Sequence, residues 1–258
     1  MKTIAIIPVR MGSSRFPGKP LAKIHGIPMV EHCLRRTELA ACFDRICVAT
    51  CDIEIADFVN SIGGEVVMTA DTHTRATTRT AEAVEILEKR DAAKFDVVVM
   101  VQGDEALIAP ETIAETIPPL DDAGIAIVNI MSRLQNEAQF RDHNNVKVVV
   151  NKFGNALYFS REPIPSPWKG IENNPMYMQT GIIAFRKSTL AYFNSLPETL
   201  LEQIESVDMN RVIENGDTIR MVLTDKVTIG IDTPEELVEA ERIMTDDPVL
   251  ALYRNRRV

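Results

Sequence analysis

The chain has 258 residues, of which 45% are hydrophobic and 25% are charged, and its formal net charge is −9. This balance is typical of a globular protein with a sizeable core, and it lacks the basic excess expected of a nucleic-acid-binding protein. No apolar run approaches the roughly 18 residues that a membrane helix needs. The four cysteines form no C-x-x-C pair, so we expect a cytoplasmic protein that binds neither nucleic acid nor membrane.

Strands and helices alternate over the first hundred residues. Short apolar runs predict strands at 3–8, 45–50, 65–68 and 96–101, and helical spacing predicts helices at 29–39, from Asp52 as N-cap, and at 80–89. Continuous β-branched runs, each followed by a helix, are typical of a parallel sheet covered on both faces. We therefore predict an α/β fold with a doubly wound, mostly parallel, Rossmann-like sheet.

From about residue 125 the pattern changes. Strands are predicted at 125–131, 146–150, 156–160, 179–186 and 219–223, with a hairpin-like turn at 151–155. A final helix is expected after Thr233, with Pro234 at its first position and Glu236 completing a capping box. We predict one domain over 1–258, with a smaller mixed α/β segment inserted at about 132–185.

The loop after the first predicted strand is rich in phosphate-binding chemistry. It runs from Arg10 to Lys19 and holds three cations, two glycines and two hydroxyls. Ligands of open α/β sheets bind at the carboxyl ends of the strands, and backbone N–H groups with charged donors suit a triphosphate. The loop is no Walker A motif, because Pro20 follows Lys19 where Ser or Thr is required. An ordinary surface loop is the alternative.

Two carboxylates are candidates for Mg²⁺, a hard cation that prefers oxygen ligands. Asp104 follows the apolar strand ending at Val101, and Asp232 precedes the last helix. The alternatives are a turn-forming role for Asp104 and a helix-capping role for Asp232.

The segment Arg75–Arg79 brings two arginines to a predicted helix N-terminus, which favours an anion site over solvated surface arginines. The four histidines, at 25, 32, 73 and 143, share no metal or catalytic-triad spacing and are expected to be surface or structural residues.

Taken together, these segments resemble the CMP-Kdo synthetase family, the 3-deoxy-manno-octulosonate cytidylyltransferases. The resemblance runs almost end to end. It is carried by IIPVRMGSSRFPGKPL (6–21), EVVMT (65–69), VQGDE (101–105), NVKVV (145–149), ALYFSREPIP (156–165) and GIDTPEEL (230–237).

The resemblance implies a nucleotidyltransferase fold that binds CTP, a small acidic acceptor and Mg²⁺, and a homodimer built by the inserted segment. It places the metal on Asp104 and Asp232 and the catalytic cations at Lys19, Arg10 and Arg15. The nucleotide-binding residues would be Pro8, Arg10, Gly12, Ser13, Ser14, Arg15, Lys19 and Gln102. The acceptor-binding residues would be Arg75, Thr77, Arg79, Gln102, Arg161, Gln179, Glu205 and Asp208. The pathway implied is lipopolysaccharide or surface-glycan biosynthesis.

The departures from the family pattern gather on the acceptor side. The family usually reads S-G-T-D/E-R where this chain has Arg75–Arg79, and His where it has Gln179. Ala106 replaces a proline, and the expected helix at 201–211 carries Asp208 and Asn210. The family resemblance therefore supports the reaction type better than it supports the identity of the acceptor. We predict CMP transfer from CTP to Kdo or a Kdo-like acid. The alternatives are a nonulosonic acid, an amino-Kdo or a small phosphonate as acceptor, or a nucleotide-binding protein without turnover.

Overall fold

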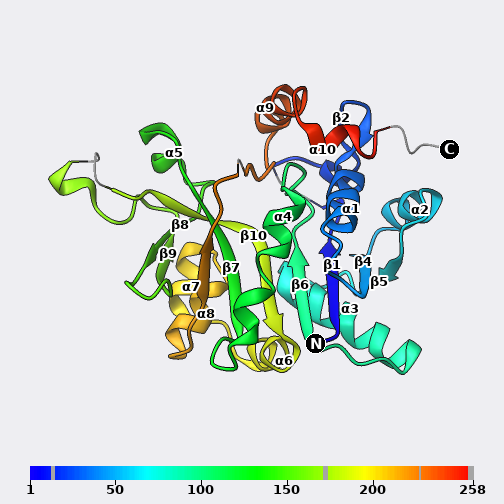
Figure 1. Ribbon diagram of the computed structural model, residues 1–258, viewed down its shortest axis with the longest axis horizontal. Helices are drawn as coiled ribbons and strands as arrows, with labels where there is room; N and C mark the ends of the chain where they lie inside the picture. Colours follow the sequence, from blue (N-terminus) through cyan, green and yellow to red (C-terminus); the bar gives the residue numbers. More distant parts are fainter. Residues whose placement is uncertain (13–14, 171–173, 227, 255–258) are drawn as a thin grey trace. The chain divides into compact units, whose positions relative to one another are not determined.

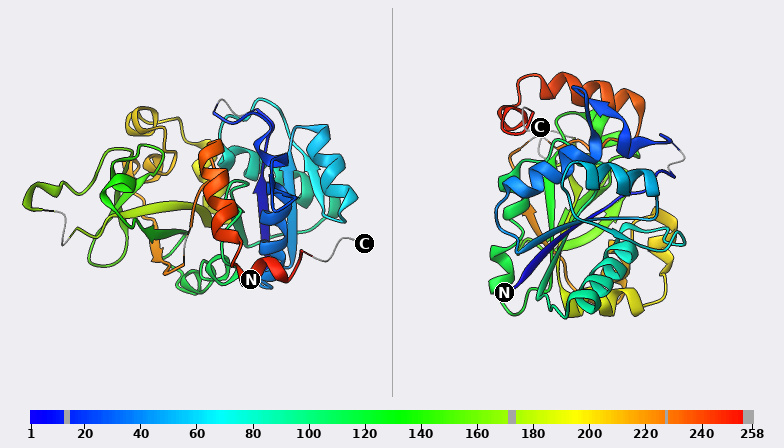
Figure 2. Two further views of the ribbon diagram at one scale, coloured as in Figure 1. Left: turned by 90° about the horizontal axis from the view of Figure 1, so that it is seen from above. Right: turned by 90° about the vertical axis from the view of Figure 1, so that its right-hand side faces the viewer.

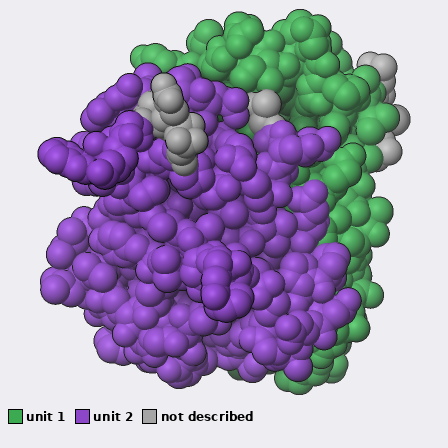
Figure 3. Space-filling model, turned by 60° about the vertical axis from the view of Figure 1, so that its left-hand side comes forward, with its two compact units in different colours: residues 1–114, 227–258 green, residues 115–226 purple. Residues whose placement is uncertain are grey.

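The computed structural model describes residues 1–12, 15–170, 174–226 and 228–254, and the chain divides into two compact units (Figures 1 and 3). Unit 1 comprises residues 1–114 and 227–258, and unit 2 comprises residues 115–226. The segment predicted at 132–185 falls within unit 2, and its roles in acceptor binding and dimerisation stay predictions. None of the described helices is long and apolar enough to cross a membrane.

Unit 1 is built on a parallel sheet. Strand β1 (Thr3–Pro8) pairs with β6 (Val97–Val101) on one side and β4 (Arg45–Thr50) on the other, and β5 (Val66–Met68) pairs with β4. Helices α1 (Met29–Leu39) and α2 (Ile53–Ser61) cover one face, and α3 (Ala76–Asp91) covers the other (Figure 2). The strands are apolar along their length because both faces are buried, which confirms the doubly wound prediction.

The remaining elements of unit 1 are short or C-terminal. They are a 3-10 turn (Lys19–Leu21), β2 (Lys23–Ile24), β3 (Ile27–Pro28), α4 (Pro110–Ala114), α9 (Pro234–Met244) and α10 (Pro248–Ala251). The predicted capping box of α9 is present: the Thr233 hydroxyl accepts from the Glu236 N–H at 3.2 Å, and the Glu236 carboxylate accepts from the Thr233 N–H at 2.8 Å.

Unit 2 is a mixed sheet. Strand β7 (Ile127–Arg133) pairs antiparallel with β10 (Tyr177–Arg186) and parallel with β11 (Arg220–Leu223), and β8 (Lys147–Val150) pairs antiparallel with both β10 and β9 (Ala156–Ser160). Its helices are α5 (Glu137–Arg141), α6 (Lys187–Ser195), α7 (Leu200–Glu205) and α8 (Met209–Glu214), with 3-10 turns at Pro118–Asp121 and Pro167–Lys169. The predicted hairpin turn at 151–155 joins β8 to β9.

The prediction of a single helix at 201–211 is wrong. The chain forms α7 and α8 instead, separated at Ser206, whose φ of 53° is left-handed. The Asn210 side chain accepts from the Phe159 N–H at 3.2 Å and donates to the Phe159 carbonyl at 3.0 Å. This buried amide therefore fastens α8 to strand β9 through both of its polar atoms.

A buried network fastens the C-terminal segment to the rest of unit 1. The His32 ring, which is fully buried, lies 2.7 Å from the Tyr253 hydroxyl and 3.0 Å from the Ile24 carbonyl. The Arg36 guanidinium donates to the same hydroxyl and forms an ion pair with Asp247. Because the carbonyl can only accept, the His32 Nε2 donates to it, and the Nδ1 accepts from the tyrosine.

This network predicts acid sensitivity. Burial lowers the pKa of His32 from 6.5 to about 4, so the folded protein binds fewer protons than the unfolded chain between these values. Stability therefore falls as pH drops from about 6.5 towards 4, by up to about 3 kcal/mol. A His32→Gln variant keeps an amide donor and an acceptor without titrating, so urea unfolding should show a flatter pH dependence. Equal pH dependence in both proteins would contradict the prediction.

Candidate active site

The loop after β1 is closed by its own backbone. The Gly18 N–H donates to the Met11 carbonyl at 3.2 Å, and Gly18 has a φ of 75°, a left-handed conformation that favours glycine. The Met11 N–H donates to the Asp52 carboxylate at 2.7 Å. Asp52 stands at the N-cap position of α2 as predicted, but its side chain makes no capping bond. The nearby Met11 N–H takes that carboxylate, so Asp52 fixes the loop and not the helix.

Four charged side chains converge beside this loop. The Lys19 Nζ lies 3.0 Å from the Asp104 Oδ2 and 2.9 Å from the Asp232 Oδ1. The Arg15 Nη2 lies 2.8 Å from the other Asp232 oxygen. Residues from three distant parts of the sequence therefore form one cluster at the carboxyl ends of β1 and β6.

Asp104 reaches this position because the loop after β6 lies against the end of β1. A Cβ on Gly103 would come within 2.1 Å of a Val9 methyl group and 3.3 Å of the Pro8 carbonyl oxygen, so only glycine permits the approach. The Asp104 carbonyl accepts from the Ile231 N–H at 3.1 Å. This bond brings the chain before α9, and with it Asp232, next to Asp104.

The capping interpretation of Asp232 is excluded by the same geometry. Thr233 caps α9 with its own side chain, and the Asp232 N–H donates to Glu236 at 2.7 Å. The Asp232 carboxylate instead contacts Lys19 and Arg15. Its side chain therefore serves the charged cluster, not the helix.

Lys19 is held as a cation. Burial lowers the pKa of its ammonium, but the charges and hydrogen bonds of Asp104 and Asp232 outweigh the burial and raise that pKa above its ordinary value. Its side chain is only 14% exposed. The cluster is therefore two carboxylates balanced by two permanent cations.

An Asp232→Asn variant tests the second carboxylate. We expect turnover to fall by at least about tenfold, because the amide keeps the shape but loses the negative charge that a divalent cation requires. The melting temperature should stay near the parent value, since Thr233 still caps α9. Unchanged activity per folded molecule would show that Asp232 does no more than pair with Lys19 and Arg15.

The second loop, after β5, is fastened by α3. The Arg79 guanidinium is buried and donates to the Thr69 hydroxyl at 2.5 Å and to the Ala70 carbonyl at 3.3 Å. Its Nη2 has no hydrogen-bond partner among the described residues, which leaves one buried donor for a ligand. Thr77 is also buried, and Arg75 is half-buried at the N-cap position of α3 without a side-chain cap.

The structure adds a supporting pair at this loop: His73, expected to be a surface or structural residue, and Glu82, which the sequence analysis did not identify. The His73 Nε2 lies 2.6 Å from the Glu82 carboxylate, which also accepts from the Ala70 N–H at 2.8 Å. The predicted nucleotide-binding Arg10 donates to the His73 carbonyl at 3.3 Å. Glu82 lies two helical turns into α3, and only its position opposite the loop reveals this role.

The other predicted nucleotide-binding residues lie at the same edge of unit 1. Pro8 ends β1, Gly12 is exposed, and the half-buried Gln102 follows β6. The Gln102 amide makes no hydrogen bond with the described residues, so it is free to meet a ligand. Ser13 and Ser14 lie outside the described residues.

In unit 2 the structure joins two predicted acceptor residues. The Glu205 carboxylate accepts from the Arg161 N–H at 2.8 Å, the Ser160 hydroxyl at 2.7 Å and the Tyr158 hydroxyl at 2.9 Å. Burial raises the pKa of Glu205, but these three hydrogen bonds hold it below the ordinary value. The Arg161 Nε donates back to the Glu205 carbonyl at 2.8 Å. Glu205 therefore positions Arg161 and the end of β9.

Gln179 lies close to this pair. In the sheet, Lys147 of β8 lies between Met178 of β10 and Ser160 of β9. One residue further along the strands, Val146 therefore lies between Gln179 and Arg161. Asp208 is half-buried at the start of α8.

A bulge interrupts β10 just after Gln179. The buried Asn129 amide fills it by donating to the Thr180 carbonyl at 3.0 Å and the Ile182 carbonyl at 2.9 Å. Bulges of this kind re-aim neighbouring side chains.

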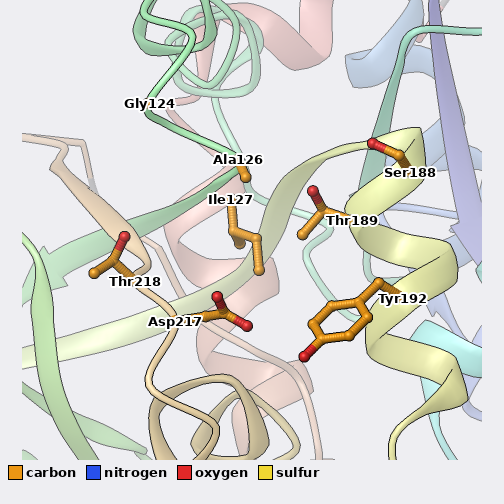
Figure 4. Close-up of a pocket in the computed structure, with 8 residues that line it drawn as sticks. All are labelled: Gly124, Ala126, Ile127, Ser188, Thr189, Tyr192, Asp217 and Thr218. Atoms are coloured by element: carbon orange, nitrogen blue, oxygen red, sulfur yellow. The ribbon is translucent and has the colours of Figure 1, made fainter.

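Unit 2 also contains a hollow of about 350 Å³ (Figure 4). Tyr192 and Asp217 face each other across it, and its other lining residues are Gly124, Ala126, Ile127, Ser188, Thr189 and Thr218. The lining has one carboxylate and no basic side chain, so it does not suit a triphosphate. It lies at the end of β10 opposite to Gln179.

Comparison with known proteins shows the family to which the chain belongs. The family described as cytidylyltransferase matches residues 4–220. The 3-deoxy-manno-octulosonate cytidylyltransferase of Syntrophotalea carbinolica is 43% identical over 93% of this chain and 98% of its own length. That of Thermodesulfovibrio yellowstonii is 41% identical over 95% and 98%. A solved CMP:2-keto-3-deoxy-manno-octonic acid synthetase complexed with CTP superposes with a TM-score of 0.86 at 34% identity, over 96% of this chain and 100% of the other.

The parallel sheet with a cationic loop and two carboxylates at its edge is that of a nucleotidyltransferase. Within this class, the chain belongs to the cytidylyltransferase family. The predicted family and fold are confirmed.

Proposed function

We propose that this protein transfers CMP from CTP to a 3-deoxy-ulosonic sugar acid, Kdo or a close relative, and releases pyrophosphate. The observation that carries the proposal is the contact of Lys19 with both Asp104 and Asp232, in a chain whose relatives are named for this reaction. The family resemblance also leads us to propose a homodimer that works in the cytoplasm, in lipopolysaccharide or surface-glycan assembly.

The donor set fits Mg²⁺. The described residues contain no group of three or more potential ligands among His, Cys, Asp and Glu, but Mg²⁺ binds through one or two carboxylates and completes its shell with phosphates and water. Asp104 and Asp232 would hold it. Bound there, Mg²⁺ would supply charge neutralisation and Lewis-acid activation at the reacting phosphate.

The chain's own residues supply the rest. We propose that Lys19, Arg15 and Arg10 neutralise the α-phosphate and the departing pyrophosphate. The acceptor oxygen bonds to the α-phosphorus, the bond from that phosphorus to the β-phosphate bridging oxygen breaks, and the acceptor proton passes to solvent. Catalysis of this kind rests on positioning and electrostatics and needs no covalent nucleophile.

A pyrophosphate-release assay with CTP and a panel of acids tests the proposal. The panel includes Kdo, an amino-Kdo, a nonulosonic acid and a small phosphonate, with ATP, GTP and UTP as nucleotide controls. We expect release only with CTP and a ulosonic acid. CTP binding without release for any acid would identify a non-catalytic nucleotide-binding protein instead.

The acceptor preference is a separate prediction. Arg75 stands where the family usually has Ser, and Gln179 where it usually has His. Arg75 adds a two-pronged cationic donor, and Gln179 removes a titratable one. We expect a kcat/KM for unmodified Kdo below about 10⁴ M⁻¹s⁻¹, with a related acid preferred. The double variant Arg75→Ser with Gln179→His should shift preference towards Kdo.

The control for the Arg75→Ser substitution is the stability of the variant protein. Ser at the N-cap position would give α3 the side-chain cap that Arg75 does not provide, worth about 1 kcal/mol. A loss of activity in the Arg75→Ser variant is therefore not explained by unfolding. A wild-type kcat/KM for Kdo in the ordinary enzyme range would overturn the acceptor prediction.

A further inference from the structure

Lys19 occupies an unusual position for a residue expected to contact phosphates. Its ammonium lies 3.0 Å from Asp104 and 2.9 Å from Asp232, the two carboxylates that would hold a divalent cation. Arg15 takes the remaining oxygen of Asp232 at 2.8 Å. In this arrangement the two negative charges are already balanced by two positive ones.

A divalent cation and this ammonium need the same oxygen atoms. Mg²⁺ binds carboxylate oxygens at about 2.1 Å, and two cations this close in a partly buried site repel strongly. The Lys19 side chain is 14% exposed and the carboxylates are 22% and 26% exposed, so solvent screens the repulsion poorly. A metal can therefore bind these carboxylates well only when Lys19 has moved to another anion.

The triphosphate of CTP is that anion. Lys19 has a flexible four-carbon stem, and it is the last residue of the loop that would bind the phosphates. Arg15 is 45% exposed and belongs to the same loop. Both cations are therefore carried on flexible side chains of the loop that would bind the phosphates.

We propose that Lys19 is the internal counter-ion of the Asp104–Asp232 pair in the nucleotide-free protein, and that it transfers to the triphosphate when CTP binds. This rests on the proposed function. The consequence is positive coupling between metal and nucleotide. The metal binds weakly alone and tightly after CTP, and by linkage the metal strengthens CTP binding by the same factor.

The test measures Mn²⁺ affinity in the absence of nucleotide, by electron paramagnetic resonance of free Mn²⁺. The proteins compared are the wild type, Lys19→Met, and Lys23→Met as a control that loses the same charge from an exposed neighbour. We expect Lys19→Met to bind Mn²⁺ at least about tenfold more tightly than the wild type. Lys23→Met should match the wild type.

A second measurement uses CTP affinity in EDTA and in Mn²⁺. The gain from metal should be larger in the wild type than in Lys19→Met, because only the wild type must first release the ammonium. If Lys19→Met does not fold, Lys19→Gln carries the same expectation with a polar side chain.

Mn²⁺ binding to nucleotide-free Lys19→Met or Lys19→Gln that is no tighter than wild type overturns the counter-ion role. This outcome is distinct from failure of the proposed function. A wild-type protein that releases no pyrophosphate with any acid would fail as a transferase even where the Lys19 variants bind Mn²⁺ more tightly.

Discussion

Asp104→Ala lowers turnover by at least about 10³-fold if Asp104 anchors the catalytic metal, because the loss of one of two carboxylates removes half of the side-chain negative charge that would hold a divalent cation. The geometry separates this effect from folding. Asp104 contacts the segment before α9 through its backbone carbonyl, which accepts from the Ile231 N–H. Because this bond does not involve the side chain, it persists in the variant. Lys19 also keeps its ion pair with Asp232.

The measurement is kcat with CTP and the preferred acid, together with the melting temperature. Asp57→Ala, in an exposed part of α2, is the matched control and should retain full activity. The Asp104→Ala melting temperature should stay within a few degrees of the parent. Residual turnover above about a tenth of wild type would show that Asp104 is only a turn residue.

Lys19→Met is expected to lower kcat by roughly 10²–10³-fold with a smaller effect on the KM for CTP. The reason is that the negative charge on the departing pyrophosphate grows in the transition state, so a cation that meets it there matters more for kcat than for ground-state binding. Lys19→Arg should recover only part of the loss. Its planar fork keeps the charge but does not reproduce the compact ammonium that would meet the departing pyrophosphate.

Steady-state kinetics on the three proteins, with saturating Mg²⁺, checks this expectation. A change confined to the KM for CTP would mean that Lys19 contributes only to ground-state phosphate binding. Activity restored fully by Lys19→Arg would mean that the charge alone matters and that the compact shape of the ammonium does not.

Much of unit 1 was predictable because its signals are local. The buried strands ending at Pro8 and Val101 are short apolar runs, and the helix after Thr233 begins with a capping sequence that acts within four residues. Periodicity and capping depend on neighbours along the chain, so a sequence displays them directly. The composition that predicts phosphate binding by the loop from Arg10 to Lys19 is local in the same way.

The tertiary structure decided which partner each charged group takes. Asp52 looked like a helix cap and instead binds the Met11 N–H. The position of Asp232 in the sequence is equally consistent with a helix cap and with a metal ligand. In the structure, the Thr233 side chain caps α9, and the Asp232 carboxylate contacts Lys19 and Arg15. The break at Ser206 likewise depends on a left-handed backbone that local helix propensity does not reveal.

The amino-acid sequence by itself determined the family, the order of the elements in unit 1 and the two carboxylates on which the chemistry is expected to rest. Only the folded chain showed that Lys19 lies between them, because Lys19, Asp104 and Asp232 are brought together by the close approach at Gly103 and by the bond from Ile231 to Asp104. Contacts between residues so far apart in the chain depend on how strands and loops pack, and no local pattern encodes their distances.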